Sequence, residues 1–215
     1  MSAGLVFPVE KYMIIIMKNK SDSSKPVRGK KEATHERIVE AAARIIRRSG
    51  FNGVSVADIM KEAGLTHGGF YAHFASREAL LAEAADHAGA ASVALSANIA
   101  ATVPSEEALS SIVHAYLSRE HLENIENGCP FTALGSEMPR QAPEIRRAAT
   151  RRIKEMVDVV ARQLPDWGQP SAHEQAFATL ATMVGALLLA RAVDDPRLAE
   201  ACLDASLKKL LPENA

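Results

Sequence analysis

The segment AGLTHGGFYAHFASREAL, residues 63–80, constrains the fold of this chain more than any other. Gly64 suits a position just past a helix end that needs a positive φ, which a residue without Cβ adopts at little cost. Thr66 and Ser76 are residue types that cap helix N-termini by accepting a backbone N–H bond. The pattern predicts a helix ending near Ala63, a very short helix opening at Thr66, and a new helix starting at Ser76. Two helices joined by such a turn form the helix-turn-helix motif, whose second helix enters a DNA major groove.

The residues before this segment predict two helices that pack with it. Apolar residues recur at helical spacing from Ile38 to Ile46, with Thr34 as the expected N-cap and Gly50 as the terminator. Ser55 and Asp58 form a capping-box variant that opens the second helix. A three-helix core is expected to be closed by Phe51, Val54, Ile59, Leu65, Phe70, Phe74 and Leu80.

Charge is distributed unevenly along the 215 residues, although the formal net charge is only −1. Residues 18–80 hold 12 Lys and Arg against 7 Asp and Glu, whereas residues 81–215 hold 12 against 18. A basic N-terminal part beside an acidic remainder is typical of a nucleic-acid module joined to a part that does not contact phosphate. The 47% of apolar residues indicates an ordinary globular protein, and a disordered or fibrous fold is excluded.

The pattern predicts three parts: an extension with a basic arm over residues 1–33, a helix-turn-helix domain over 34–80, and a second helical domain over 81–215. Two interpretations of residues 1–16 are open: an extension from a start codon upstream of Met17, or an apolar tail that packs on the domain or on a partner. Export is disfavoured because most lysines follow the apolar run. The two cysteines, Cys129 and Cys202, form no disulfide framework or zinc pattern, so a cytoplasmic location is expected.

The segment SAHEQAFATLATMVGALLLARAV is apolar on nearly every side, so a helix there must be buried all round. The 16 uncharged residues between Glu174 and Arg191 are fewer than the ~20 that cross a bilayer, and a buried helix is favoured. Ser171 and Glu174 form its expected capping box. One stripe, running from Phe177 to Leu188, is expected to face the core, and a stripe of smaller residues to face another helix. With the last helix this predicts half of a four-helix dimer interface, formed by Ala178, Thr182, Gly185, Leu189, Leu203 and Leu207. The alternative is a monomer in which the last helix covers the exposed stripe.

Signatures of catalysis and of metal binding are missing from the sequence. It has no G-x-S-x-G, H-E-x-x-H or P-loop, and no G-x-G-x-x-G after a strand. Six residues along a helix place His67 and His73 about 120° apart, so they cannot converge on one ion. We expect no catalytic residues, no metal and no cofactor, and a small helical enzyme or carrier is the disfavoured alternative.

The order of these pieces resembles the DNA-binding domain of the TetR family of bacterial repressors. The resemblance covers about fifty residues, through RRSGFNGVSV, ADIMKEAG, the Tyr-x-His-Phe signature and Ser-Arg-Glu-x-Leu. It implies an all-α homodimer with an N-terminal helix-turn-helix domain and a C-terminal helical ligand-binding and dimerisation domain. Such a protein would bind a palindromic operator in double-stranded DNA and be released by a small, apolar effector.

The resemblance also implies roles for individual residues at the DNA. The phosphate contacts would come from Ser55, Thr66, the backbone amide of Gly68, Tyr71, His73 and Arg77. His67 and Gly69 occupy the positions turned to base edges. Because Gly69 has no side chain, sequence readout would rest on His67, backbone approach and DNA shape.

Residues for the effector site have a weaker basis in the sequence. An apolar pocket between helices is expected to be lined by Phe131, Met138, Met156, Trp167, Phe177 and Met183. Cys129 has two open interpretations, an inert buried cysteine or a thiol that senses oxidants or electrophiles. A membrane-associated factor using residues 5–17 is a further alternative, although no membrane partner is expected.

Overall fold

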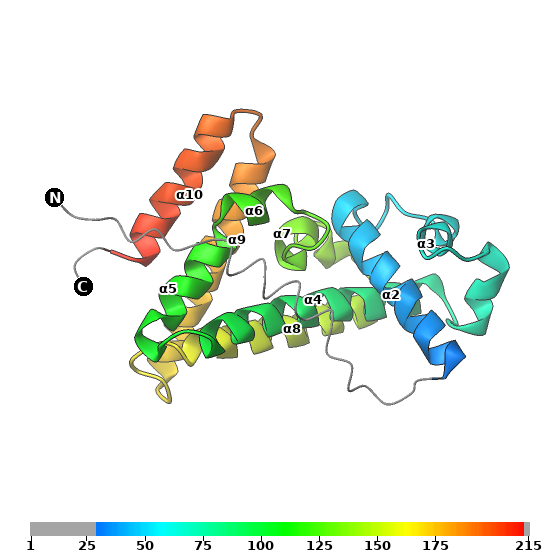
Figure 1. Ribbon diagram of the computed structural model, residues 1–215, viewed down its shortest axis with the longest axis horizontal. Coiled ribbons are helices and arrows are strands. Elements are labelled where there is room, and N and C mark those ends of the chain that lie inside the picture. Colours follow the sequence, from blue (N-terminus) through cyan, green and yellow to red (C-terminus); the bar gives the residue numbers. More distant parts are fainter. Residues whose placement is uncertain (1–28, 213–215) are drawn as a thin grey trace.

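The computed structural model describes residues 29–212, and every regular element in that range is helical. Figure 1 shows α2, α3 and η1 at one end of the long helix α4, with α5, α9 and α10 toward its other end. The predicted all-α class is therefore confirmed. In chain order the elements are α2 (Lys30–Ser49), α3 (Val56–Glu62), the 3-10 helix η1 (His67–Ala72), α4 (Arg77–Ala101), α5 (Ser105–Tyr116), α6 (Arg119–Glu123), α7 (Pro130–Leu134), the 3-10 helix η2 (Met138–Arg140), α8 (Pro143–Ala161), α9 (Pro170–Ala192) and α10 (Pro196–Leu210).

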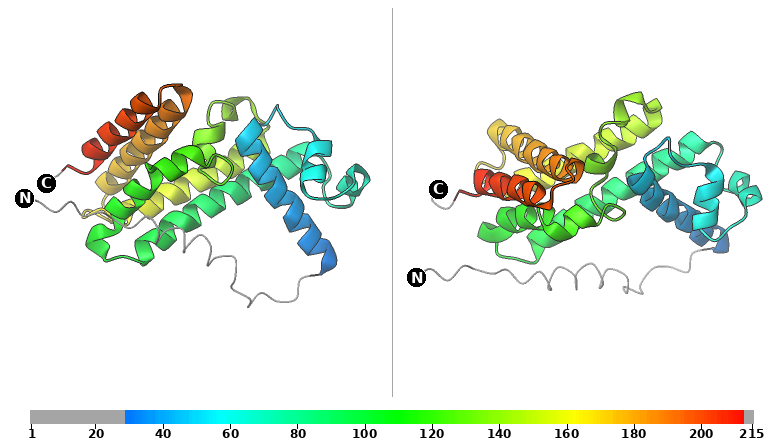
Figure 2. Two further views of the ribbon diagram at one scale, coloured as in Figure 1. Left: turned by 45° about the horizontal axis from the view of Figure 1, so that its top comes forward. Right: turned by 90° about the horizontal axis from the view of Figure 1, so that it is seen from above.

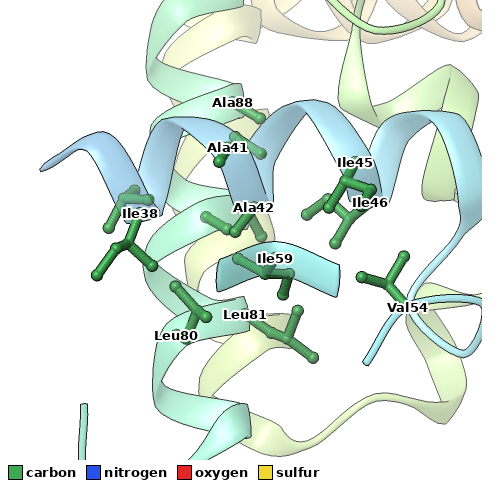
Figure 3. Close-up of a cluster of buried hydrophobic side chains, with 14 of the residues drawn as sticks. Ile38, Ala41, Ala42, Ile45, Ile46, Val54, Ile59, Leu80, Leu81 and Ala88 are labelled. Carbon is green, nitrogen blue, oxygen red and sulfur yellow. The ribbon is translucent and has the colours of Figure 1, made fainter. Parts of the chain in front are cut away.

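The N-terminal helices form a head around one apolar core, part of which is drawn in Figure 3. α2 places Ile38, Ala42 and Ile46 inside, because they lie on one face at helical spacing and none of them is exposed. The seven residues predicted to close this core all pack in it, although Leu65 is only partly buried. The core also takes Leu134 from α7 and Ile145 from α8. The packing of the head therefore continues beyond the predicted domain limit at residue 80.

Helix α4 connects the head to the rest of the chain and lies against α8 along much of its length (Figures 1 and 2). Ser76 caps it by accepting from the backbone N–H of Ala79 at 3.1 Å, as the sequence predicts. The two helices approach closely at Gly89, where a Cβ would lie 2.6 Å from Cγ of Arg152. Only glycine fits at this crossing.

A second core lies between α5, α8, α9 and α10. α9 packs on both α8 and α10, and its buried residues include Thr179, Met183 and Leu187. By length and composition alone α9 could span a membrane, a property that it shares with core helices of soluble proteins. The predicted core stripe of α9 needs correction, because Phe177 is 52% exposed and Leu188 38% exposed.

Several helix starts differ from the prediction. α2 begins at Lys30, within the stretch predicted as an extension, and the Thr34 hydroxyl donates to the Lys30 carbonyl instead of capping the helix. α9 begins at Pro170, and the Ser171 hydroxyl donates to Asp166 without forming the expected capping box. In both cases a cap-type side chain lies one or more residues inside the helix, where it bonds locally. The expectations for residues 1–28 lie outside the described residues.

Candidate DNA-binding surface and effector cavity

The region around α3 and η1 follows the sequence prediction at Ser55 and Gly64, whereas the Thr66 side chain makes no capping hydrogen bond. Ser55 accepts from the backbone N–H of Asp58, and the Asp58 carboxylate accepts from the backbone N–H of Ser55, which completes the capping box. Gly64 has a φ of 68°, and the Leu65 N–H donates to the Met60 carbonyl at 2.8 Å across the turn. η1 follows as a single 3-10 helix whose Phe70 is buried in the head. One face of η1 is therefore fixed to the core and the other is free.

Most of the residues predicted to contact DNA are exposed in or near η1 and at the start of α3. Tyr71 is 74% exposed although it is a large aromatic residue, and its ring packs edge-on against Phe70 at 5.1 Å. Buried Phe70 thus holds the exposed phenol in place. The exposed surface also includes Ser55, Thr66, His67 and Gly68. It offers hydroxyls, an imidazole and helix-start amides, which are groups that bind phosphates and base edges.

Three of the predicted DNA residues need correction. The Arg77 guanidinium donates to the carbonyls of Phe51 and Val54, at 3.0 Å for Val54, so it braces the head and is only half-exposed. A Cβ on Gly69 would lie 3.5 Å from Cε of Met60, so this position faces α3. His73 is half-buried.

The imidazole of His73 lies against other rings of the head. Its ring centroid is 6.0 Å from that of His35, and its buried Nδ1 has no partner within the described part of the chain. Burial lowers the pKa of His73, and the charges of His35 and Lys31 lower it further. A neutral imidazole is the favoured form, so a cationic contact with phosphate is weakened at this position.

The C-terminal helical part of the chain contains a cavity of about 470 Å³, which is within the range of small-molecule sites in proteins. Its apolar lining comes from α4, α5, α8 and α10, through Leu95, Ile99, Ile112, Met156 and Leu207. The polar lining comes from Ser92 and Ser96 of α4, from α5 and α6, and from the loop of residues 124–129.

Of the six residues predicted to line an effector pocket, this cavity includes only Met156. Met183 is fully buried in the second core, and Phe131 is partly buried against it. Met138 packs against the core of the head. Trp167 and Phe177 lie on the surface, 46% and 52% exposed. The prediction used apolar side chains alone and missed the polar wall.

That polar wall is organised by His121. Its Nδ1 donates to the Tyr116 carbonyl at 2.7 Å, and its Nε2 accepts from the backbone N–H of Cys129 at 2.9 Å. These partners fix the neutral tautomer with the proton on Nδ1. Burial lowers the pKa of His121 to about 4, the Tyr116 carbonyl opposes this shift, and Arg191 adds to it. The cavity therefore presents an uncharged histidine at neutral pH.

Tyr116 and Cys129 complete this wall. The Tyr116 hydroxyl lies 2.9 Å from Oγ1 of Thr132, and burial raises its pKa, so the phenol stays protonated. The Cys129 side chain is only 2% exposed. Gly128 lies close to His121 in this wall, because a Cβ there would lie 2.9 Å from Nε2 of His121. Only the fold reveals that Asn127, Gly128 and Cys129 line a cavity.

The residues predicted to form a dimer interface divide into two groups. Ala178 and Leu189 are exposed on α9, and Thr182 and Gly185 are half-exposed on the same helix. Leu203 and Leu207 need correction, because Leu203 is 5% exposed in the second core and Leu207 lines the cavity. The exposed apolar surface extends instead to Phe177 and to Leu198 of α10, which is 54% exposed.

Two family models match this chain. Residues 38–84 match the model described as bacterial regulatory proteins of the tetR family, and residues 105–202 match the C-terminal domain of LmrA/YxaF-like transcriptional regulators. A helix-turn-helix-type transcriptional regulator of Mycobacterium tuberculosis is 32% identical over 173 residues, which cover 74% of this chain and 85% of that protein. The chain belongs to the TetR family of transcriptional regulators.

Other relatives and solved structures agree with this assignment. A helix-turn-helix-type regulator of Lactococcus lactis is 26% identical over 180 residues, covering 80% of this chain and 90% of that protein. A TetR-family regulator of Cytophaga hutchinsonii superposes with a TM-score of 0.73 at 21% identity, covering 86% of this chain and 94% of that one. A TetR regulator of Chloroflexus aurantiacus has a TM-score of 0.68 at 26% identity, with 84% and 93% covered. As a TetR-family member, this chain is a DNA-binding regulator built from a helix-turn-helix head and a C-terminal helical domain.

Proposed function

We propose that this TetR-family regulator is a dimeric repressor that binds a palindromic operator and releases it when a small apolar molecule occupies the cavity of about 470 Å³. The observation that carries the proposal is the presence of both parts in one chain. An exposed η1 face lies at one end of α4, and a cavity lined by Leu95 and Ile99 of α4 lies toward the other.

The role in DNA binding is supported by the chemistry of the free face of η1. Ser55, Thr66, Gly68 and Tyr71 are exposed, and their hydroxyls and the Gly68 amide are groups that would contact phosphates and set the register on the duplex. His67 is the exposed side chain on η1 proposed to read base edges.

The dimer is supported by exposed apolar side chains on two helices that pack on each other. Phe177 and Leu189 of α9 and Leu198 of α10 are all more than half exposed, which is costly in water unless another surface covers them. A second copy would cover the same face symmetrically and present two η1 helices to successive major grooves about 34 Å apart.

The class of effector is supported by the cavity wall. Its charged groups, Arg119 and Glu120, belong to α6. The remaining wall combines apolar side chains with neutral His121 and Tyr116, and with the polar side chains of His114, of serines and of asparagines. An uncharged, mainly apolar molecule with one or two hydrogen-bonding groups fits this wall best.

The test begins with duplexes selected from a random-sequence library on the immobilised full-length chain. The selected duplexes should contain inverted repeats, bind with a steep loss of affinity as salt rises, and be released by uncharged apolar compounds that bind the protein. A cavity-filling variant, Ser96→Phe, should abolish the binding of these compounds. Selection of sequences without two-fold symmetry, or release that survives in Ser96→Phe, would refute the proposal. Turnover of any bound compound would favour the rival function of a small helical enzyme.

A further inference from the structure

The segment of residues 124–137 forms a direct connection between the cavity wall and the DNA-binding head. Its N-terminal part, with Asn124, Asn127, Gly128 and Cys129, lines the cavity. Its centre is α7, and Figure 1 shows this short helix between α6 and α2. Leu134, at the end of α7, is fully buried in the core of the head. One short segment therefore belongs to both sites.

Both ends of this segment hold the C-terminal end of α2. At one end, Nη1 of Arg48 lies 2.7 Å from Oε1 of Glu126, and Nη1 of Arg47 donates to the Gly128 carbonyl at 3.4 Å. At the other end, the Phe51 N–H donates to Oε2 of Glu137 at 3.0 Å.

The contact at Glu137 is also tight in space. Gly50 has a φ of 74°, and a Cβ there would lie 2.3 Å from Oε1 of Glu137. The turn after α2 is thus in contact with Glu137 both through this close approach and through the hydrogen bond from Phe51.

Arg47 is the most informative of these contacts, because it is 8% exposed and its Nε has no hydrogen-bond partner among the described residues. Burial lowers its pKa to about 10, with the Cys129 thiol acting in the opposite direction. A buried guanidinium that is only partly paired contributes little to stability. Its position between Gly128 and the head is better explained by a role in coupling.

The turn after α2 is also bonded on the side of the head that carries η1. The carbonyl of Phe51, whose N–H is held by Glu137, accepts from Arg77 at the start of α4, directly after η1. A displacement of the cavity wall at Gly128 can therefore reach η1 through α2 and the turn of residues 50–54.

We propose that residues 124–137 couple occupation of the cavity to the position of η1 through Arg47, Arg48 and Glu137, in parallel with α4. This inference rests on the proposed function, since it takes the cavity as the effector site. Because coupling between two sites is reciprocal, DNA bound to the head must alter the cavity wall even when no effector is present.

The experiment measures hydrogen exchange of the full-length chain with and without a selected duplex. In the wild-type protein, DNA should change the exchange of peptides covering residues 121–134 severalfold. In the double variant Arg47→Met, Arg48→Gln this change should vanish, while peptides of α4 still respond and duplex affinity stays within about threefold. The matched control is Arg44→Gln on the same helix, because Arg44 pairs with Glu62 inside the head at 3.8 Å and should leave the response intact.

Two outcomes would overturn the coupling: no exchange change over residues 121–134 in the wild type, or an equal change in the double variant. A separate titration with the uncharged dye N-phenyl-1-naphthylamine tests the cavity itself. The dye should bind the wild type and should not bind Ser96→Phe. Bound dye should weaken duplex affinity about tenfold in the wild type and less than twofold in the double variant. Equal weakening in both would also overturn the coupling. Cavity binding without effect on wild-type DNA affinity would refute the effector role instead, and the exchange experiment would still decide the coupling.

Discussion

Arg152 and Asp86 form a two-point ion pair that joins α8 to α4. Nε of Arg152 lies 2.8 Å from Oδ1 of Asp86, and Nη2 lies 2.6 Å from Oδ2. Arg151 also donates to Oδ1, at 2.5 Å. Burial alone would raise the pKa of Asp86, but the hydrogen bonds from the two arginines outweigh it and lower that pKa. The pairing with Asp86 raises the pKa of Arg152.

We predict that Asp86→Asn lowers the free energy of unfolding by about 1–3 kcal/mol, because it removes the charge from a two-point hydrogen bond between packed helices. Since the folded-state pKa is lowered, the contribution of Asp86 is present above the ordinary carboxyl pKa and is lost as pH falls through the folded pKa. Urea unfolding at pH 7 and below pH 4 measures both effects. Glu123→Gln, which removes an exposed pair with Arg119, is the control and should change nothing measurable. A wild-type midpoint for Asp86→Asn would contradict the prediction.

His121 should make stability fall in mildly acidic solution. Its folded pKa is about 4 against about 6.5 when unfolded, so the unfolded chain binds more protons between these values. The free energy of unfolding should fall by up to about 1.4 kcal/mol per pH unit as pH drops through this window. His121→Gln should reduce this slope. Equal slopes in wild type and His121→Gln would argue against the buried neutral form.

Tyr71 and His67 should affect DNA binding differently. Tyr71→Phe removes one exposed hydroxyl, so affinity for every duplex should fall about fivefold, roughly 1 kcal/mol, with no loss of thermal stability. His67→Ala should instead change the ranking of operator variants, because base contacts specify sequence and phosphate contacts do not. Equilibrium binding to a panel of single-base variants measures both. A uniform loss for His67→Ala would remove its proposed role.

Arg77→Ala should act mainly on stability. The guanidinium donates to two backbone carbonyls of the turn after α2, and its loss leaves both acceptors without these bonds. We expect the free energy of unfolding to fall by about 1.5–3 kcal/mol. At a low temperature, where both the wild type and the variant are folded, the free energy of DNA binding should change less than the free energy of unfolding. A large loss of affinity at unchanged stability would instead support a direct phosphate contact.

Leu189→Glu should shift the protein from dimer to monomer. The side chain is 57% exposed in the single chain, so the substitution leaves the core intact, whereas a charge would be buried in the proposed interface. Sedimentation velocity at micromolar concentration measures the shift. Ile125→Glu, at a residue 39% exposed on the loop after α6, is the matched control and should sediment as the wild type does. Unchanged sedimentation of Leu189→Glu would place the interface elsewhere.

Local signals in the sequence predicted the head well. The capping box at Ser55, the cap at Ser76 and the positive φ of Gly64 depend on neighbours within a few residues, so a pattern in the sequence is enough to find them. Arg77 was misjudged because its partners, Phe51 and Val54, are more than twenty residues away. Nothing in the sequence around Arg77 indicates that it faces a turn.

The cavity could not be predicted for a related reason. Periodicity shows which residues of α9 are apolar, but not which side the neighbouring helices cover, and Phe177 was therefore placed inside although it is half exposed. His121 was missed because its function depends on Tyr116 and Cys129, which only the fold brings to its two nitrogens. Apolar composition identified Met156 alone among the lining residues.

The burial of Leu134 and Ile145 among the side chains of the head has a consequence for engineering with this protein. Chimeric regulators are designed by cutting between modules, and the matched tetR model, residues 38–84, suggests where to cut. A head excised at that limit would lose two fully buried side chains and gain two holes in its core. A transplant that carries α7 and the first turn of α8 with the head, or that fills both holes with larger side chains, should fold where the shorter graft aggregates.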